Sequence, residues 1–236
     1  MSSLDETLQA RVRRVHERIS AAARAAGRDP ASIGLVAVSK TYGPDLVLAA
    51  TRARLRRFAE NYVQEGVEKI ARVREAAPDL VLEWHFIGPL QANKTRPVAE
   101  SFDWVQSIER TRVAQRLAEQ RPAGLPPLNV LLQVNISGEE TKSGVPPAEV
   151  AALAAAVAAL PRLRLRGLMA IPAPASAPAE QRRPFARLRQ LLESLRAHGH
   201  DLDTLSMGMS EDLEAAILEG ATMVRIGAAI FGARGP

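Results

Sequence analysis

The chain has 236 residues, of which 47% are hydrophobic and 24% charged, with a formal net charge of +5 and a pI near 10.2. This composition provides one large core, and the excess positive charge suits an anionic small ligand as well as a nucleic acid. The arginines are scattered at helical spacings without a compact basic block interleaved with aromatics, so nucleic-acid binding is not expected. No cysteine is present, and the four histidines lack an HExxH-type spacing, so neither disulfides nor a metal site is expected.

The first predicted element is an amphipathic helix. Apolar residues recur at helical spacing from Leu4 to Ile19, with acidic residues between them, which is typical of a helix docked on a core rather than of a signal peptide. We expect it to be an extra N-terminal helix that covers the bottom of the fold. The most apolar run, 150–160, is too short to span a bilayer, so a cytoplasmic location without a membrane partner is expected.

Short apolar runs then alternate with helical patterns along the rest of the chain. The predicted strands are 33–39, 56–60, 83–88, 103–107, 128–136, 163–169, 202–207 and 221–227. The predicted helices are 45–54, 61–76, 90–99, 110–121, 147–160, 180–198 and 211–219, the last with Ser210 as its N-cap. This alternation predicts a single α/β domain, 1–236, folded as a (β/α)8 TIM-type barrel. An open doubly wound sheet is the alternative, although the dinucleotide glycine motif is absent after the first strand.

One long connection stands out, the Pro/Ala-rich segment 171–184 after the sixth strand. It is either a surface connection or a lid over the site.

The functional residues of such a barrel lie where its strands end. The residues found there are Lys40, Glu60, Asn61, His85, Gly88, Ser107, Asn135, Met169, Ser206, Arg225 and Gly227. No pair of acids of the glycosidase kind emerges from this set. The ends of strands seven and eight usually form the phosphate site of a barrel, and here Ser206, Gly208, Gly227 and Ala228 predict an anion site.

Lys40 directly follows a strand that reads as buried. A cation near the amine, such as Arg225, or partial desolvation favours the neutral lysine that condenses with an aldehyde to a Schiff base. The alternatives are a lysine that reaches solvent or one that pairs with Glu60. His85 is either part of the site or a hydrogen-bonded core histidine.

Seven motifs resemble one family in order along the chain. They are VAVSKTYG, AENYVQEGVEK, WHFIGPLQANKTR, VQSIER, VNISGEETKSG, GLMAIP and LSMGMSEDLEAAILEGATMVRIGAAIFGAR. Together they resemble the pyridoxal phosphate homeostasis proteins, barrels related to the N-terminal domain of alanine racemase. The resemblance implies pyridoxal 5'-phosphate (PLP) bound as a Schiff base on Lys40, with Arg225 facing the pyridine nitrogen and Asn61 near the ring.

The same resemblance implies that Ser206 and the backbone at Gly227 and Ala228 bind the phosphate, and His85 is included among the cofactor-binding candidates. The family commonly has threonine where this chain has Ala228, so one hydroxyl contact to the phosphate is missing.

An arginine at the pyridine nitrogen disfavours its protonation and weakens PLP as an electron sink. Tyr62 is the one internal candidate for a second base. We therefore expect a PLP carrier, without strong turnover, that takes part in PLP homeostasis and delivers PLP to amino acids or PLP-dependent apoenzymes by transimination. Because the second domain of a racemase is not found, a monomer is expected.

Three alternatives remain open at this point. A fold-type III amino-acid racemase or decarboxylase would exchange the α-proton of its substrate. A class I aldolase-like enzyme would need Glu60 beside Lys40. A protein that acts through interactions alone would not need Lys40 at all.

Overall fold

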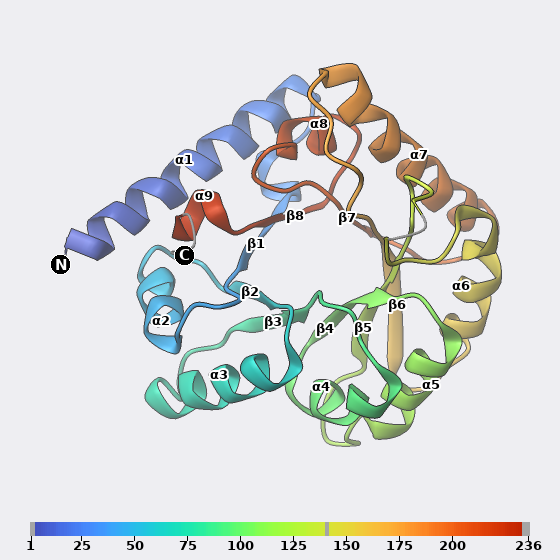
Figure 1. Cartoon of the computed structure of the whole chain (residues 1–236), viewed down its shortest axis with the longest axis horizontal. Coiled ribbons are helices and arrows are strands. Elements are labelled where there is room, and N and C mark those ends of the chain that lie inside the picture. Colours follow the sequence, from blue (N-terminus) through green and yellow to red (C-terminus); the bar gives the residue numbers. More distant parts are fainter. Residues whose placement is uncertain (1–2, 140–141, 233–236) are drawn as a thin grey trace.

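The computed structural model describes residues 3–139 and 142–232, so the predicted domain bounds, 1–236, extend beyond it at both ends. Eight parallel strands close into a barrel in the order of the sequence, with each strand paired to its neighbour and β8 paired to β1 (Figure 1). The strands are β1 (Gly34–Val38), β2 (Arg57–Glu60), β3 (Glu83–Phe86), β4 (Trp104–Ile108), β5 (Leu128–Gln133), β6 (Leu163–Met169), β7 (Thr204–Ser206) and β8 (Met223–Ile226). The predicted (β/α)8 barrel is confirmed, and the open sheet is excluded.

Helices follow the strands and form the outer layer. The α-helices are α1 (Ser3–Ala25), α2 (Pro44–Arg52), α3 (Val63–Ala76), α4 (Thr95–Ser101), α5 (Thr111–Gln120), α6 (Val150–Ala158), α7 (Pro178–Ala197), α8 (Leu213–Leu218) and α9 (Ala228–Phe231). Short 3-10 helices are η1 (Pro30–Ser32), η2 (Ala92–Lys94) and η3 (Pro147–Glu149). Two predicted helices, 90–99 and 147–160, thus begin as 3-10 turns and continue as α4 and α6.

The extra helix α1 lies along the side of the barrel, so the expectation that it covers the bottom is wrong (Figure 1). It packs against α2, α8 and α9. Arg18 forms two hydrogen bonds of 2.6 and 2.8 Å to the Glu214 carboxylate on α8, and Arg28 donates to the Ala221 carbonyl at 2.8 Å. Because α8 and α9 are short, the apolar stripe of α1 completes the outer layer beside β8 and β1.

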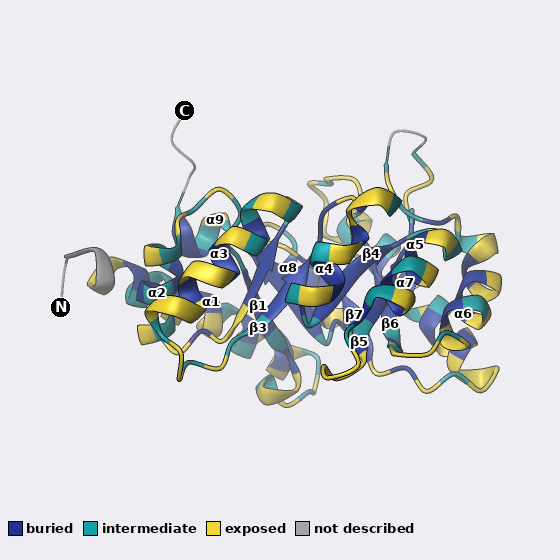
Figure 2. Cartoon of the chain, turned by 90° about the horizontal axis from the view of Figure 1, so that it is seen from below, coloured by how far each residue is buried: buried dark blue, intermediate teal, exposed yellow. Residues whose placement is uncertain are grey.

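The buried apolar residues form two clusters, and Figure 2 shows the dark blue, buried parts of the ribbon at the centre of the molecule. The larger cluster fills the space between strands and helices. The smaller cluster is formed by Val36, Ala59, Ile87, Trp104, Leu131, Met169 and Met223. These residues come from six of the eight strands and from the residue that follows β3, and with the polar side chains described below they fill the interior. The interior is therefore a packed core, and a ligand site has to lie at an end of the barrel.

Strand five is shorter than the predicted run 128–136. After β5 only Val134 continues, through an isolated bridge to Val145. Asn135 then turns the chain, because its Nδ2 donates to the Glu139 carbonyl at 2.8 Å and its Oδ1 accepts from the Gly138 N–H at 3.0 Å. An asparagine that satisfies loop backbone in this way competes with strand continuation.

Two further predictions on the C-terminal half are corrected. The loop expected over 171–184 ends earlier, since α7 begins at Pro178 and runs through Pro184. The helix predicted over 180–198 is therefore confirmed, with its start two residues earlier. A proline starts a helix well, and one inside a helix removes a single backbone donor. Ser210 is not the N-cap of its helix, because α8 begins only at Leu213 and its N-cap position is Asp212.

Candidate functional site

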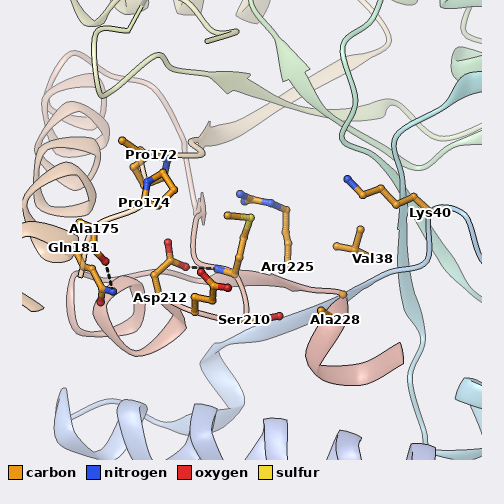
Figure 3. Close-up of a pocket in the computed structure, with 14 residues that line it drawn as sticks. Val38, Lys40, Pro172, Pro174, Ala175, Gln181, Ser210, Asp212, Arg225 and Ala228 are labelled. Atoms are coloured by element: carbon orange, nitrogen blue, oxygen red, sulfur yellow. Dashed lines mark hydrogen bonds between the residues drawn. The ribbon is translucent and has the colours of Figure 1, made fainter. Parts of the chain in front are cut away.

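A cavity of about 360 Å³ lies where β1 and β8 end, bounded by the connections that follow β6 and β7. This volume falls within the range of about 300–1,000 Å³ typical of small-molecule sites. Its lining consists of Val38, Lys40, residues 172–175, Gln181, residues 209–212, Arg225, Gly227 and Ala228. In Figure 3, the side chains of Lys40 and Arg225 extend into the same space, and Pro172, Ala175 and Gln181 lie on the side away from Lys40. The structure therefore brings Lys40, Arg225, Gly227 and Ala228 together.

Lys40 is half-buried in the turn after β1. The preceding residue is tied to the barrel, since the Ser39 N–H donates to the Ala59 carbonyl at 3.0 Å. The following residue, Thr41, has a φ of 70°, which is uncommon for a β-branched residue. Its N–H donates to Glu65 Oε1 at 2.5 Å. The backbone on both sides of Lys40 is thus held by neighbouring elements.

A buried ion cluster supports this turn. Lys69 on α3 is fully buried, and its Nζ donates to the Ser39 carbonyl and to Glu60 Oε1, both at 2.7 Å. It also contacts Glu65 Oε1 at 2.9 Å. Burial raises the pKa of the Glu60 carboxyl, while Lys69 and the Ser39 hydroxyl, 2.6 Å away, lower it. Glu60 therefore serves the turn that carries Lys40 and does not line the cavity.

The Arg225 guanidinium is buried at the floor of the cavity. Its Nη1 donates to the Ser206 hydroxyl at 2.7 Å and its Nη2 to the Ala170 carbonyl at 3.0 Å. Burial lowers the pKa of Arg225 to about 10, against an opposing effect of Asp212, so the group is a cation at neutral pH. These two bonds occupy two of its five N–H groups, which leaves donors for a ligand acceptor.

The wall formed after β7 and β8 combines three small residues, Ser210, Gly227 and Ala228, with the larger side chains of residues 209, 211 and 212. Gly208 has a φ of 94°, and a Cβ there would lie 2.6 Å from the Cβ of Ala216, so only glycine fits. Ser210 lines the cavity, and its Oγ accepts from the Ala229 N–H at 3.4 Å. Ala228 is exposed to the cavity at the start of α9.

Two acids share this wall. Glu211 is exposed, and Asp212 Oδ1 accepts the Met209 N–H at 2.6 Å. Both carboxylates are therefore satisfied by solvent or backbone.

Three of the cofactor-binding candidates lie outside the cavity lining. Ser206 is fully buried behind Arg225, and its hydroxyl donates to Gln106 Oε1 at 2.6 Å. His85 is fully buried inside the barrel, between Glu83 and Gln106. Asn61 is half-buried at the end of β2, and its buried Oδ1 has no hydrogen-bond partner among the described residues.

Ser210, Gln181 and Gln106 are not among the site residues that the sequence predicts. The sequence around Ser210 is typical of a helix cap, and the signal that points to the cavity is its place between the glycines at the ends of strands seven and eight. Gln181 falls where the predicted loop 171–184 and the predicted helix 180–198 overlap, and its Nε2 donates to the Ala175 carbonyl at 2.8 Å. Nothing in the sequence singles out Gln106, because the pattern of an apolar strand does not show which partner a glutamine inside it will bind.

Neither of the tyrosines, nor the glutamate considered for an aldolase, lines the cavity. Tyr62 is 55% exposed and does not line the cavity. The Tyr42 hydroxyl donates to the Gly232 carbonyl at 3.0 Å. The position of Glu60 beside Lys69 gives the aldolase alternative no support.

A family model described as the N-terminal domain of alanine racemase matches residues 11–235. The chain is therefore a barrel of the alanine racemase N-terminal domain family. The pyridoxal phosphate homeostasis protein of Pseudomonas aeruginosa is 60% identical over 228 residues, which cover 97% of this chain and 96% of that protein. The protein of the same name from Escherichia coli is 58% identical over 223 residues, 93% of this chain and 94% of that one. Within the larger family, the chain belongs to the pyridoxal phosphate homeostasis proteins.

Solved structures agree with this assignment. PipY of Synechococcus elongatus, determined with PLP bound, superposes with a TM-score of 0.79 at 34% identity, covering 92% of this chain and all of that one. An alanine racemase of Clostridium difficile superposes with a TM-score of 0.75 at 15% identity and shows the shared fold alone. Among the described residues, no helix has the length and apolarity needed to cross a membrane.

Proposed function

We propose that this protein binds PLP as a Schiff base on Lys40 and takes part in intracellular PLP homeostasis. The observation that carries the proposal is that Lys40 and the cationic Arg225 line the same cavity, in a chain whose relatives are named for PLP. A lysine amine, the cationic Arg225 and a wall that includes Gly227 and Ala228 suit a ligand that combines an aldehyde, a ring nitrogen and a phosphate. The unpartnered Oδ1 of Asn61 is a buried acceptor near the same end of the barrel and fits a ligand or a water there.

The phosphate end is assigned to the wall after β7 and β8. The Ser210 hydroxyl and the backbone at Gly227 and Ala228 are the groups on that wall that can hold an anion. The carboxylates of Glu211 and Asp212 repel an anion, so we expect the phosphate to lie away from these two side chains. Ser206 does not line the cavity, and because its hydroxyl accepts from Arg225 it can affect a ligand only through that guanidinium.

When bound, PLP supplies an aldehyde that condenses with amines and a ring that withdraws electrons most strongly when its nitrogen is protonated. Arg225 remains a cation at neutral pH, so it donates a hydrogen bond and opposes a second positive charge nearby. Tyr62 and Tyr42 do not line the cavity and therefore offer no second base. These residues favour storage and transfer of PLP, to an amino acid or a PLP-dependent apoenzyme whose amine displaces Lys40, over racemisation or decarboxylation.

The test is the visible spectrum of the protein after addition of PLP. A yellow Schiff-base band is expected in the parent and in Lys94→Ala, a control that removes an exposed lysine. Lys40→Ala should lack the band and keep the melting temperature of the parent. If the parent shows no band, or if Lys40→Ala shows the same one, the proposal is wrong. Exchange of amino-acid α-protons in heavy water by the loaded protein would favour the racemase alternative.

A further inference from the structure

A series of polar side chains crosses the interior of the barrel. Its members, here named the interior chain, are Glu83 and His85 on β3, Gln106 on β4, Ser206 on β7 and Arg225 on β8. The successive hydrogen-bond distances from Glu83 to Arg225 are 2.9, 2.9, 2.6 and 2.7 Å. Because β4 and β7 are not neighbouring strands, the bond between Gln106 and Ser206 spans the inside of the barrel. The interior chain joins the cavity to the opposite end of the barrel.

The direction of every bond in the interior chain is fixed by its first member. Glu83 also forms an ion pair with the Arg57 guanidinium at 3.1 Å. Burial raises the pKa of Glu83, but the hydrogen bond to His85 and the charge of Arg57 outweigh it and hold the pKa below the ordinary value. A carboxylate can only accept, so His85 donates from Nε2. Burial lowers the pKa of His85, which leaves the ring neutral with a lone pair on Nδ1.

The remaining bonds follow from that lone pair. Gln106 has to turn its amide N–H toward His85 Nδ1, so its carbonyl oxygen faces Ser206. The Ser206 hydroxyl then donates to Gln106 and keeps its lone pairs for the Arg225 N–H. Stacking of the His85 ring on Trp104, at 5.3 Å between centroids, and the contact of Gln106 Nε2 with the Met223 sulfur at 3.2 Å hold both side chains in place.

We propose that the interior chain positions the Arg225 guanidinium at the cavity. Gln106 is the residue that passes the bond direction fixed at Glu83 on to Ser206 and so orients the guanidinium. Gln106 is a positioning residue, because it acts through Ser206 and does not line the cavity. A reversed Gln106 amide would present an N–H to Ser206 in place of the oxygen that accepts the Ser206 O–H. The hydroxyl proton would lose this acceptor, and the orientation in which Ser206 accepts from Arg225 would no longer be fixed. This inference rests on the proposed PLP site, since PLP is the ligand that Arg225 would orient.

The first experiment compares Gln106→Met with Gln133→Met, a control that replaces a buried glutamine of the neighbouring strand whose amide donates to the Ser143 carbonyl. Methionine keeps the length of the side chain, but its thioether sulfur is only a weak acceptor for the Ser206 O–H. Loss of one hydrogen bond that supports a charged group predicts PLP binding weaker by about tenfold in Gln106→Met. The absorption maximum of bound PLP should also shift, whereas Gln133→Met should match the parent in both.

A second variant separates positioning from packing. Gln106→Glu retains an acceptor for Ser206, so its PLP spectrum should stay that of the parent, while His85, now between two carboxylates, becomes doubly protonated. Equal affinity and spectrum for the parent and Gln106→Met would overturn the proposal, as would a Gln106→Glu spectrum shifted as far as that of Gln106→Met. A parent that binds no PLP would instead refute the proposed function.

One measurement needs no variant and no PLP. Nitrogen NMR of the His85 ring in the apoprotein near pH 7 should show a neutral ring protonated on Nε2 alone. A ring protonated on Nδ1, or on both nitrogens, would contradict the fixed direction of the interior chain even if Gln106→Met failed to fold.

Discussion

Replacement of Lys69 by methionine tests how the turn that carries Lys40 is supported. Lys69 and Glu60 are both buried, at 3% and 0% side-chain exposure, and their charged atoms lie 2.7 Å apart. Removal of one partner of such a pair leaves an uncompensated buried charge and costs about 3–5 kcal/mol. In a domain with about 5–15 kcal/mol of total stability, this loss lowers the melting temperature on the order of 10 °C.

The pH dependence identifies the cause of that loss. Burial already raises the pKa of Glu60 above its ordinary value, and without Lys69 it rises further. The folded variant then binds a proton that the unfolded chain has lost, so its stability falls as the pH increases above about 4.5. The deficit of Lys69→Met relative to the parent should be largest at pH 7–8 and smaller near pH 5.

The assay is urea unfolding at several pH values, followed by circular dichroism. The double variant Glu60→Gln/Lys69→Met should recover most of the stability, because no buried charge remains, and Lys94→Met, at an exposed lysine, should stay within about 0.5 kcal/mol of the parent. At a temperature where Lys69→Met is folded, its PLP affinity should also be lower, since Lys69 no longer holds the Ser39 carbonyl. A loss under 1 kcal/mol, or one that is the same at pH 5 and pH 8, would refute this reasoning.

Three further predictions concern the cavity and the interior chain. Ala228→Thr adds a hydroxyl at the cavity wall and should tighten PLP binding by about three- to tenfold in a fluorescence titration, with unchanged affinity contradicting the phosphate assignment. Gly208→Ala places a Cβ 2.6 Å from Ala216 at a φ of 94° and should cost about 1–3 kcal/mol in urea unfolding, whereas a stability equal to that of the parent would contradict the steric argument. Because burial lowers the pKa of His85, the unfolded chain binds its proton first on acidification, so the stability should fall as the pH decreases below about 6.5. In His85→Gln the free energy of unfolding should change less with pH between about 5.5 and 7.5 than it does in the parent. The same pH dependence in both proteins would show that His85 does not cause the loss of stability on acidification.

The sequence predicts the fold well because its signals are local. Each apolar run between helical patterns forms a strand, and the spacing predicts an alternating α/β fold. Closure into a barrel, as opposed to an open doubly wound sheet, is established by the pairing of β8 with β1. The strand ends likewise bring Lys40, Arg225, Gly227 and Ala228 to one cavity, since all parallel strands end at the same face. Where the prediction is wrong, a competing local interaction explains it: Asn135 satisfies loop backbone and ends β5, and the short α8 and α9 leave a side of the barrel for α1.

Side-chain partners across the barrel could not be predicted in this way. Ser206 and Arg225 lie on neighbouring strands, but whether Ser206 faces the cavity or lies behind Arg225 depends on where Arg225 packs. Gln106 and Ser206 are 100 residues apart and meet only because the barrel closes with a particular stagger. The positions of Ser210 and Gln181 depend on turns and a helix start that proline and glycine patterns define only loosely.

The site of attachment is the most direct test of the account. After borohydride reduction of the PLP-loaded protein, proteolysis and mass spectrometry should locate one stable pyridoxyl group on the peptide that contains Lys40. A pyridoxyl group found instead on Lys69, Lys94 or Lys142, or no modified peptide from a protein that is yellow before reduction, would contradict it.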